Sequence, residues 1–239
     1  MVRLVVMLTA LTLLAAACEP DNGVVGPTPG SGVPTHVEAE NFNDVVLTGA
    51  ARSAEAGFSG TYALRATVDG TAIAGTISWH RKETKMRADF AGTVAGERKD
   101  VTVIAGPNYP TDDLLYVCKP DQQTCAEAHR TVSGDDPAEL VPSLVAFQLL
   151  DVTNFAAGLN FYDEVARTLV EQPALCFVGL SETVPVGAID HGEVCLTEGG
   201  LPLLVTAAGA GRTMSLTATK VPGSASDRAF ELPYAIQGQ

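Results

Sequence analysis

Charged residues are scarce in this sequence, and positively charged residues are the scarcest. Charged side chains make up 18% of the 239 residues, and 15 Lys and Arg stand against 28 Asp and Glu, which gives a formal net charge of −13. This low charge, together with an apolar content of 46%, argues against a disordered acidic chain, which needs many charges and few apolar residues. The shortage of Lys and Arg argues against binding to nucleic acid and against an electrostatic attachment to anionic lipid.

Recognisable catalytic motifs are absent as well. The sequence holds no P-loop, no HExxH and no dinucleotide fingerprint, and the stretch Gly57-Phe58-Ser59-Gly60 fails to complete a G-x-S-x-G elbow. We therefore predict that the protein is not an enzyme and that it holds no cofactor and no metal. A hydrolase assembled from a distant Ser, His and acid remains an alternative. The histidines are scattered along the chain at His36, His80, His129 and His191.

The sequence also lacks an apolar run long enough to span a membrane. The longest, Leu4 to Ala17, is shorter than the roughly 20 residues that a spanning helix needs. Because Arg3 precedes this run and small residues end it, residues 1–17 are predicted to be a signal peptide.

The end of this run, Leu14-Ala15-Ala16-Ala17-Cys18, resembles the lipobox of bacterial lipoproteins. In that family the signal peptide is cut before the cysteine, whose thiol takes a diacylglyceryl group. The family usually has Leu three places before the cysteine, where this chain has Ala15. The resemblance implies a lipid anchor at Cys18 and a location in the cell envelope, on the outer side of a membrane. An ordinary secretory signal and an uncleaved anchor are the alternatives.

An odd number of cysteines, five, has to be explained in an exported protein. Lipidation of Cys18 would leave four. Cys118 and Cys125 lie on the arms of one predicted hairpin, and Cys176 and Cys195 lie on consecutive predicted strands, so we predict the disulfides Cys118–Cys125 and Cys176–Cys195. The alternative is a zinc site that combines these residues with histidines, but its C-x6-C-x3-H pattern lacks the spacing of structural zinc loops. Its ligands would be Cys118, Cys125, His129 and either His191 or Cys195.

The chain after the signal peptide divides into a short linker and one domain. Residues 18–35 are rich in Pro and Gly and have no apolar periodicity, so we predict a lipidated N-terminus followed by a flexible tether. Residues 36–239 are predicted to form the domain. A helix is expected over about 37–56, because Phe42, Val46 and Ala50 recur every four residues, and Gly57 should end it.

From Thr61 the apolar period changes to two, which predicts six antiparallel strands over about 61–129. A region with long apolar stretches, 140–170, is predicted to hold two helical segments. Strands are expected again at Ala174–Leu180, Gly192–Thr197, Leu201–Ala207 and Arg212–Lys220. The predicted fold class is therefore mainly β (α+β), with a single curved antiparallel sheet and a helical insertion.

This order of elements resembles the LolA-like superfamily, which contains LolA and LolB lipoprotein carriers and LppX/LprG-type lipoproteins. The resemblance covers about Phe42–Pro233 and is carried by GTYALRATVDGTAIAGTISWHRKETKMRADF, by EVCLTEGGLPLLV and by MSLTATKVPGSASDRAFELP. It implies a half-open β-barrel with helices over its concave face, and an apolar cleft that holds acyl chains or lipid-modified partners.

Apolar residues at alternate strand positions, with one on the insertion helix, are the candidates to line such a cleft. They are Tyr62, Leu64, Ile73, Ile77, Trp79, Met86, Phe90, Val101, Val103, Phe147, Leu203, Val205, Met214 and Leu216. Plain core packing would leave the same alternation. The leading hypothesis is a monomeric, membrane-anchored lipoprotein that binds, and on a further hypothesis transfers, a lipid or acylated molecule. The alternative is a sensory or scaffolding envelope protein that binds a protein partner, as RseB-like regulators of the superfamily do.

Overall fold

The structure is a computed structural model that describes residues 43–107, 114–129, 141–150, 160–180, 190–209 and 211–237. All of them belong to one compact unit that spans His36–Gln239. The predicted signal peptide, Cys18 and the tether to residue 35 lie outside the described residues, and so does the first part of the predicted N-terminal helix.

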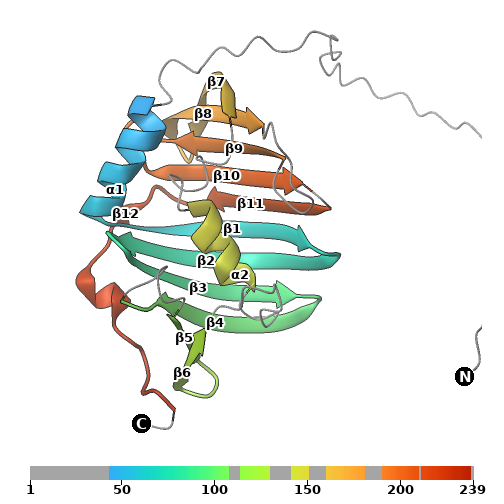
Figure 1. The fold of residues 1–239 in the computed structure, drawn as a ribbon, viewed down its shortest axis with the longest axis vertical. Coiled ribbons are helices and arrows are strands. Elements are labelled where there is room, and N and C mark those ends of the chain that lie inside the picture. The colour runs from blue at the N-terminus through green and yellow to red at the C-terminus, as the bar shows by residue number, and fades with distance from the viewer. Residues whose placement is uncertain are drawn as a thin grey trace, which may run out of the picture. The chain divides into compact units, whose positions relative to one another are not determined.

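The described chain begins with a short helical region. A π-helical segment, η1 (Asn43–Gly49), continues directly into α1 (Ala50–Ala56). Gly57 ends α1 with a positive φ of 83°, as the sequence predicts. The Ser53 hydroxyl donates to the Gly200 carbonyl at 3.1 Å, and the Glu83 amide donates to the Ala54 carbonyl at 2.8 Å. These bonds hold α1 against two turns at one end of the sheet (Figure 1).

Six consecutive strands form the first antiparallel meander, as predicted. The strands are β1 (Phe58–Val68), β2 (Thr71–Lys82), β3 (Lys85–Val94), β4 (Glu97–Ala105), β5 (Leu114–Lys119) and β6 (Thr124–His129). In β1, β2 and β3, apolar residues at alternate positions give the strand one buried face. The last five residues of β4 are buried on both faces, and Cys125 is the one buried side chain among the described residues of β6.

A second meander of five strands follows the helical insertion. Four of its strands fall where the sequence predicts them, but Asn160–Leu169 is a strand and not the second predicted helical segment. It lies at the edge of the sheet and most of its described side chains are exposed, so its sequence carries no clear period of two. The strands are β7 (Asn160–Leu169), β8 (Gln172–Leu180), β9 (His191–Leu196), β10 (Pro202–Gly209) and β11 (Arg212–Ala218).

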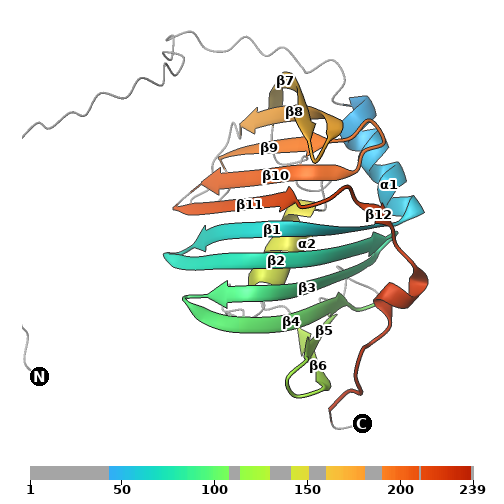
Figure 2. The same cartoon turned by 180° about the vertical axis from the view of Figure 1, so that it is seen from behind.

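The two meanders join into one open sheet through a single pairing of strands distant in sequence. The strand order is β6-β5-β4-β3-β2-β1-β11-β10-β9-β8-β7, and each pair of adjacent strands in this order is antiparallel (Figures 1 and 2). The junction is the β1–β11 ladder, in which Tyr62 is opposite Ala218 and Leu64 is opposite Leu216. The sheet is therefore a single open antiparallel sheet with β6 and β7 at its two edges.

The connection between the meanders has to cross the sheet, because β6 and β7 lie at opposite edges. Its described part is the helix α2 (Val141–Leu150), which falls within the predicted helical insertion. Helix α2 contacts β2 and β3 of the first meander and β10 and β11 of the second. It lies across one face of the sheet (Figure 1), which we call the inner face; the opposite face is the outer face.

The C-terminal segment returns along the first meander on the outer face (Figure 2). β12 (Gly223–Ser224) pairs with β1, and the 3₁₀ helix η2 (Asp227–Phe230) packs on β2 and β3. The segment ends beside the edge strand β6, where the Cys125 amide donates to the Ala235 carbonyl at 3.0 Å. Because a bare strand edge is a template for unwanted pairing, this contact protects part of the β6 edge.

Both predicted disulfides are present. Cys118 and Cys125 are directly opposite each other on β5 and β6, and Cys176 and Cys195 are opposite on β8 and β9. Each bridge therefore links two adjacent strands. Cys118–Cys125 lies at the β6 edge of the sheet, and Cys176–Cys195 lies near the β7 edge. With both pairs of sulfurs bonded to each other, the alternative zinc site loses its thiolate ligands.

Within the described ranges, none of the helices has the length and apolar character that crossing a membrane requires.

Gly200 offers a test of how α1 is held. It has φ of 80°, and an added Cβ would run into the backbone of Gly49 and Ala50. Gly211 has a similar φ of 78° but open space around it. We expect Gly211→Ala to cost about 1 kcal/mol of unfolding free energy from backbone strain, and Gly200→Ala to cost about 2–4 kcal/mol because crowding adds to the strain. Urea unfolding of both variants measures the difference, and equal losses would mean that the contact with the helical region contributes nothing.

Candidate functional site

The inner face of the sheet carries a continuous apolar surface built from rows of opposed residues. One row crosses the first meander, and a second crosses the junction between the meanders. The first consists of Tyr62, Ile77, Phe90 and Val101, and the second of Val194, Val205, Leu216 and Leu64. All of these side chains are buried. The alternation of apolar residues in each strand thus produces one surface that spans both meanders.

Tyr62 places a large ring on this surface with its hydroxyl satisfied. The hydroxyl donates to the Pro202 carbonyl at 3.0 Å, and burial raises the pKa of Tyr62, so the phenol stays protonated. A Cβ at Gly60 would collide with the Tyr62 ring, so the ring lies over this glycine. Gly60 is directly opposite Trp79 on β2, which makes Tyr62 and Trp79 neighbours on the inner face.

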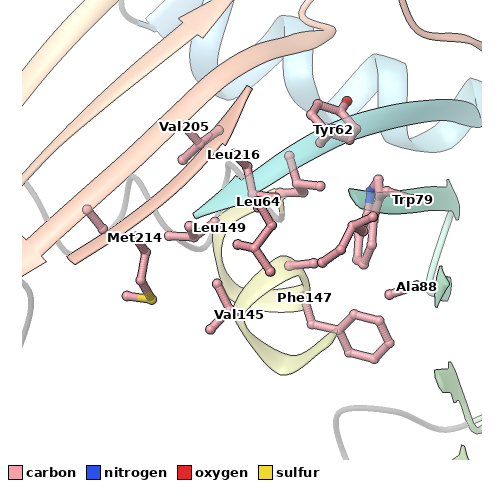
Figure 3. Close-up of a cluster of buried hydrophobic side chains, with 14 of the residues drawn as sticks. Tyr62, Leu64, Trp79, Ala88, Val145, Phe147, Leu149, Val205, Met214 and Leu216 are labelled. Atoms are coloured by element: carbon pink, nitrogen blue, oxygen red, sulfur yellow. The ribbon is translucent and has the colours of Figure 1, made fainter. Parts of the chain in front are cut away.

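Helix α2 covers this surface through apolar side chains. Its sequence, VPSLVAFQLL, has only two polar residues, Ser143 and Gln148. The Phe147 ring meets the Trp79 ring edge-on, with their centroids 5.2 Å apart (Figure 3). Val145 and Leu149 extend the contact along the helix, and both are buried. An apolar helix thus packs on the apolar inner face of the sheet.

Two polar groups within this contact have no hydrogen-bond partner in the part of the chain that the structure describes. They are the indole Nε1 of Trp79 and the hydroxyl of Ser143, and both residues are 0% exposed. Ser143 is one helical turn before Phe147, so both project from the same side of α2. A buried donor without a partner costs about 1–3 kcal/mol, so two in one contact are unusual.

The structure brings all of the predicted cleft residues into one buried cluster. Burial is common to a plain core and to a closed cleft, so it does not by itself distinguish the two. Several residues that the prediction omitted belong to the same cluster: Ala88, Leu115, Val117, Val145, Leu149, Phe177, Val194 and Leu196. Strand alternation could have found those on β3, β5, β8 and β9. No sequence signal marks Ser143.

The described residues also line two open grooves. One, of about 670 Å³, lies where β4 extends past the β5–β6 turn, and it is lined by Arg98, Lys99, Asp100, Val101 and residues 119–122. Several of its charges are already paired, as in Arg98–Asp100 and Lys99–Glu97. The other, of about 340 Å³, is lined by residues 65–67, 73, 74 and 213–215. Polar residues predominate in the first lining. The second lining is half apolar and contains Ile73 and Met214 of the predicted cleft set, so this groove adjoins the inner face.

A group of polar side chains on the outer face fastens the C-terminal segment to the sheet. Arg87 donates to the Asp89 carboxylate at 2.8 Å and to the Ala229 carbonyl at 3.0 Å. Partial burial would raise the pKa of Asp89, but hydrogen bonds from His80, Arg87 and Thr102 outweigh burial and hold this pKa below the usual value of 3.8. The cluster is structural, since its donors and acceptors are directed at one another and at the backbone.

One other group has ligand-type side chains close together. Cys176, Cys195 and Glu193 lie near one another, but the two sulfurs form a disulfide and cannot coordinate a metal as thiolates. Glu193 also lies 2.7 Å from the Arg167 guanidinium. This group therefore gives no support to a metal centre.

The lowered pKa of Asp89 predicts how acid acts on stability. A carboxylate with a depressed folded-state pKa contributes stability above its unfolded pKa, and this contribution is lost as the pH falls toward the folded value. We expect Asp89→Asn to lose about 2 kcal/mol at pH 7 and much less at pH 3. Urea unfolding at the two pH values measures this, with Asp163→Asn, at an exposed position, as the control. An equal loss for Asp89→Asn at both pH values would contradict the prediction.

No protein-family model matches the sequence, and no curated protein matches it. Solved structures with a similar fold include the lipoprotein LppX of Mycobacterium tuberculosis, at 13% identity and a TM-score of 0.44 over 76% of this chain and 95% of that one. A Vibrio parahaemolyticus domain described as an outer membrane lipoprotein-sorting domain matches at 9% identity and 0.32, over 79% and 95%. A chain of the MucA/MucB complex of Pseudomonas aeruginosa matches at 15% and 0.42, over 78% of this chain and 59% of that one. At such identities, these matches are likenesses of fold alone.

Proposed function

We propose that this domain holds the acyl chains of a lipid or an acylated molecule between the inner face of its sheet and helix α2. The observation that carries the proposal is the contact itself, in which an almost wholly apolar helix lies across an apolar surface that spans both meanders. The function is one of binding and not of catalysis. Passing the ligand to another molecule is a further part of the proposal.

Acyl chains suit this surface because they are long, flexible and apolar. Transfer of each methylene from water contributes about 0.8 kcal/mol, so a chain can replace the contacts that α2 makes with the sheet. Met86 and Met214, at two ends of the inner face, have adaptable side chains that can repack around different ligands. A ligand that enters between helix and sheet keeps both the apolar side of α2 and the inner face of the sheet out of water.

The proposed place of action is the surface of a membrane, through a lipid on Cys18. Removal of residues 1–17 takes away Arg3 and leaves 14 basic against 28 acidic residues, a net charge of 14 − 28 = −14. A domain of this charge is repelled by anionic lipid, so attachment would depend on the acyl chains, of which two hold stably where one does not.

A second candidate function is the binding of a protein partner by the same fold. The observation that favours it is the closed state of the inner face, whose apolar side chains are buried beneath the chain itself. A face that stays closed would leave other surfaces of the domain to make the contact. The first experiment below separates the two candidates.

Trp79, the single tryptophan of the chain, lies on the inner face and reports ligand entry. We expect a phospholipid with brominated acyl chains to quench most of its fluorescence, because bromine quenches on contact, while the unbrominated lipid leaves the intensity nearly unchanged. Both titrations are followed by steady-state emission.

The matched control combines Trp79→Phe with Thr213→Trp, which moves the single tryptophan to an exposed position of β11. We expect little quenching in this variant. Absence of quenching in the unaltered protein at saturating brominated lipid would overturn the acyl-binding proposal and favour the protein-partner function.

The anchor has its own test. We expect Cys18→Ser, expressed in a bacterial host, to abolish incorporation of labelled palmitate and to move the protein from the membrane fraction to the soluble fraction. Substitution of a disulfide cysteine, Cys125→Ser, serves as the control and should leave labelling intact. Unchanged membrane retention of Cys18→Ser would refute lipidation at this residue.

A further inference from the structure

The contact between α2 and the sheet contains two buried hydrogen-bond donors without an acceptor among the described residues, which apolar packing does not explain. The Trp79 indole N–H comes from the sheet and the Ser143 hydroxyl comes from the helix, and both are fully buried without a partner among the described residues. Phe147 links them, since it contacts the Trp79 ring and lies one turn from Ser143. The proposed acyl-binding contact thus has one unpaired hydrogen-bond donor on the sheet and one on helix α2.

A water molecule is a poor partner for these donors. A buried water needs two to four polar neighbours and room for its own volume. Around Trp79 the inner face offers Gly60, Ala88 and the Tyr62 ring, whose hydroxyl already donates to the Pro202 carbonyl.

A mostly apolar ligand that carries hydrogen-bond acceptors would satisfy both donors. Ester and amide carbonyl oxygens meet this requirement, because they accept hydrogen bonds strongly, carry no charge and sit at the head of an acyl chain. A hydrocarbon would leave both donors unpaired, and the carboxylate of a free fatty acid would bring a charge that is costly to bury.

On the basis of the proposed function, we infer that the ligand is an acyl ester or acyl amide, and that Trp79 Nε1–H from the sheet and Ser143 Oγ–H from α2 donate hydrogen bonds to its carbonyl oxygens. The ligand would lie between them, separating the Trp79 and Phe147 rings that touch in the closed state. Both residues then determine specificity, since they select for the carbonyl group and not for chain length.

The variants Trp79→Phe and Ser143→Ala each remove one donor and preserve most of the apolar shape. If the donors only pack, Ser143→Ala leaves the free protein as stable as before or more stable, because an unpaired buried group is lost, whereas Trp79→Phe also leaves a cavity that costs stability. In that case neither variant changes the preference for esters over hydrocarbons. If the donors bind carbonyl groups, the variants change the stability of the free protein as they would in the first case, but their affinity for esters falls. Ser78→Ala, at the adjacent position of β2 on the opposite face, is the control.

The test measures displacement of a fluorescent acyl probe by methyl oleate, by oleic acid and by 1-octadecene. We expect the unaltered protein to prefer methyl oleate to both of the others. Each donor variant should weaken methyl oleate about 3- to 10-fold, the effect of one neutral hydrogen bond, and leave 1-octadecene unchanged; Ser78→Ala should change neither.

Other outcomes contradict the inference in distinguishable ways. Equal affinity of the unaltered protein for methyl oleate and 1-octadecene, or equal losses for both in the donor variants, would overturn the carbonyl assignment and leave acyl binding intact. A preference for oleic acid would overturn the neutral-ligand class. Failure of the fluorescent probe itself to bind would overturn the proposed function and this inference with it. Ser143→Ala alone decides the question if Trp79→Phe fails to fold.

Discussion

The ladder between β1 and β11 is the interaction on which the rest of this structure depends. Each meander is built from neighbours in sequence, but only this pairing makes them one sheet. It places Leu64 beside Leu216 and so joins the apolar rows of both halves into a single inner face. It also sends β6 and β7 to opposite edges, which forces the connecting chain over that face. The covered apolar surface follows from this one long-range contact.

The two faces of the sheet are used in different ways. On the inner face, apolar side chains meet an apolar helix, and their contacts are non-directional and can be exchanged for those of a ligand. On the outer face, Arg87 and Asp89 fix the C-terminal segment through directional hydrogen bonds. Helix α1 and the two disulfides hold the end and the margins of the sheet. Among the described residues, directional bonds and disulfides thus surround the apolar contact at which we propose that a ligand binds.

Much of this architecture could be predicted from the sequence, because strands with one buried face show a period of two. The first meander, the insertion helix and both disulfides were predicted at or close to their positions. The prediction was wrong at Asn160–Leu169, because an edge strand with mostly exposed side chains loses that period. The β1–β11 ladder was beyond reach, since local patterns carry no information on pairing at this distance. That Trp79 and Ser143 have no hydrogen-bond partner among the described residues depends on what surrounds each atom, which only the three-dimensional structure reveals.

Because α2 is joined by chain to both edges of the sheet, it acts as a tethered competitor for the surface it covers. A ligand of the proposed kind would have to displace a helix whose effective concentration is set by its own connections. Its apparent affinity would equal its intrinsic affinity multiplied by the fraction of domains in which the helix has left the sheet. Small apolar molecules, which bury little area, would then bind weakly even without a steric barrier. With α2 in place, the domain keeps its apolar inner face covered, which protects it from self-association.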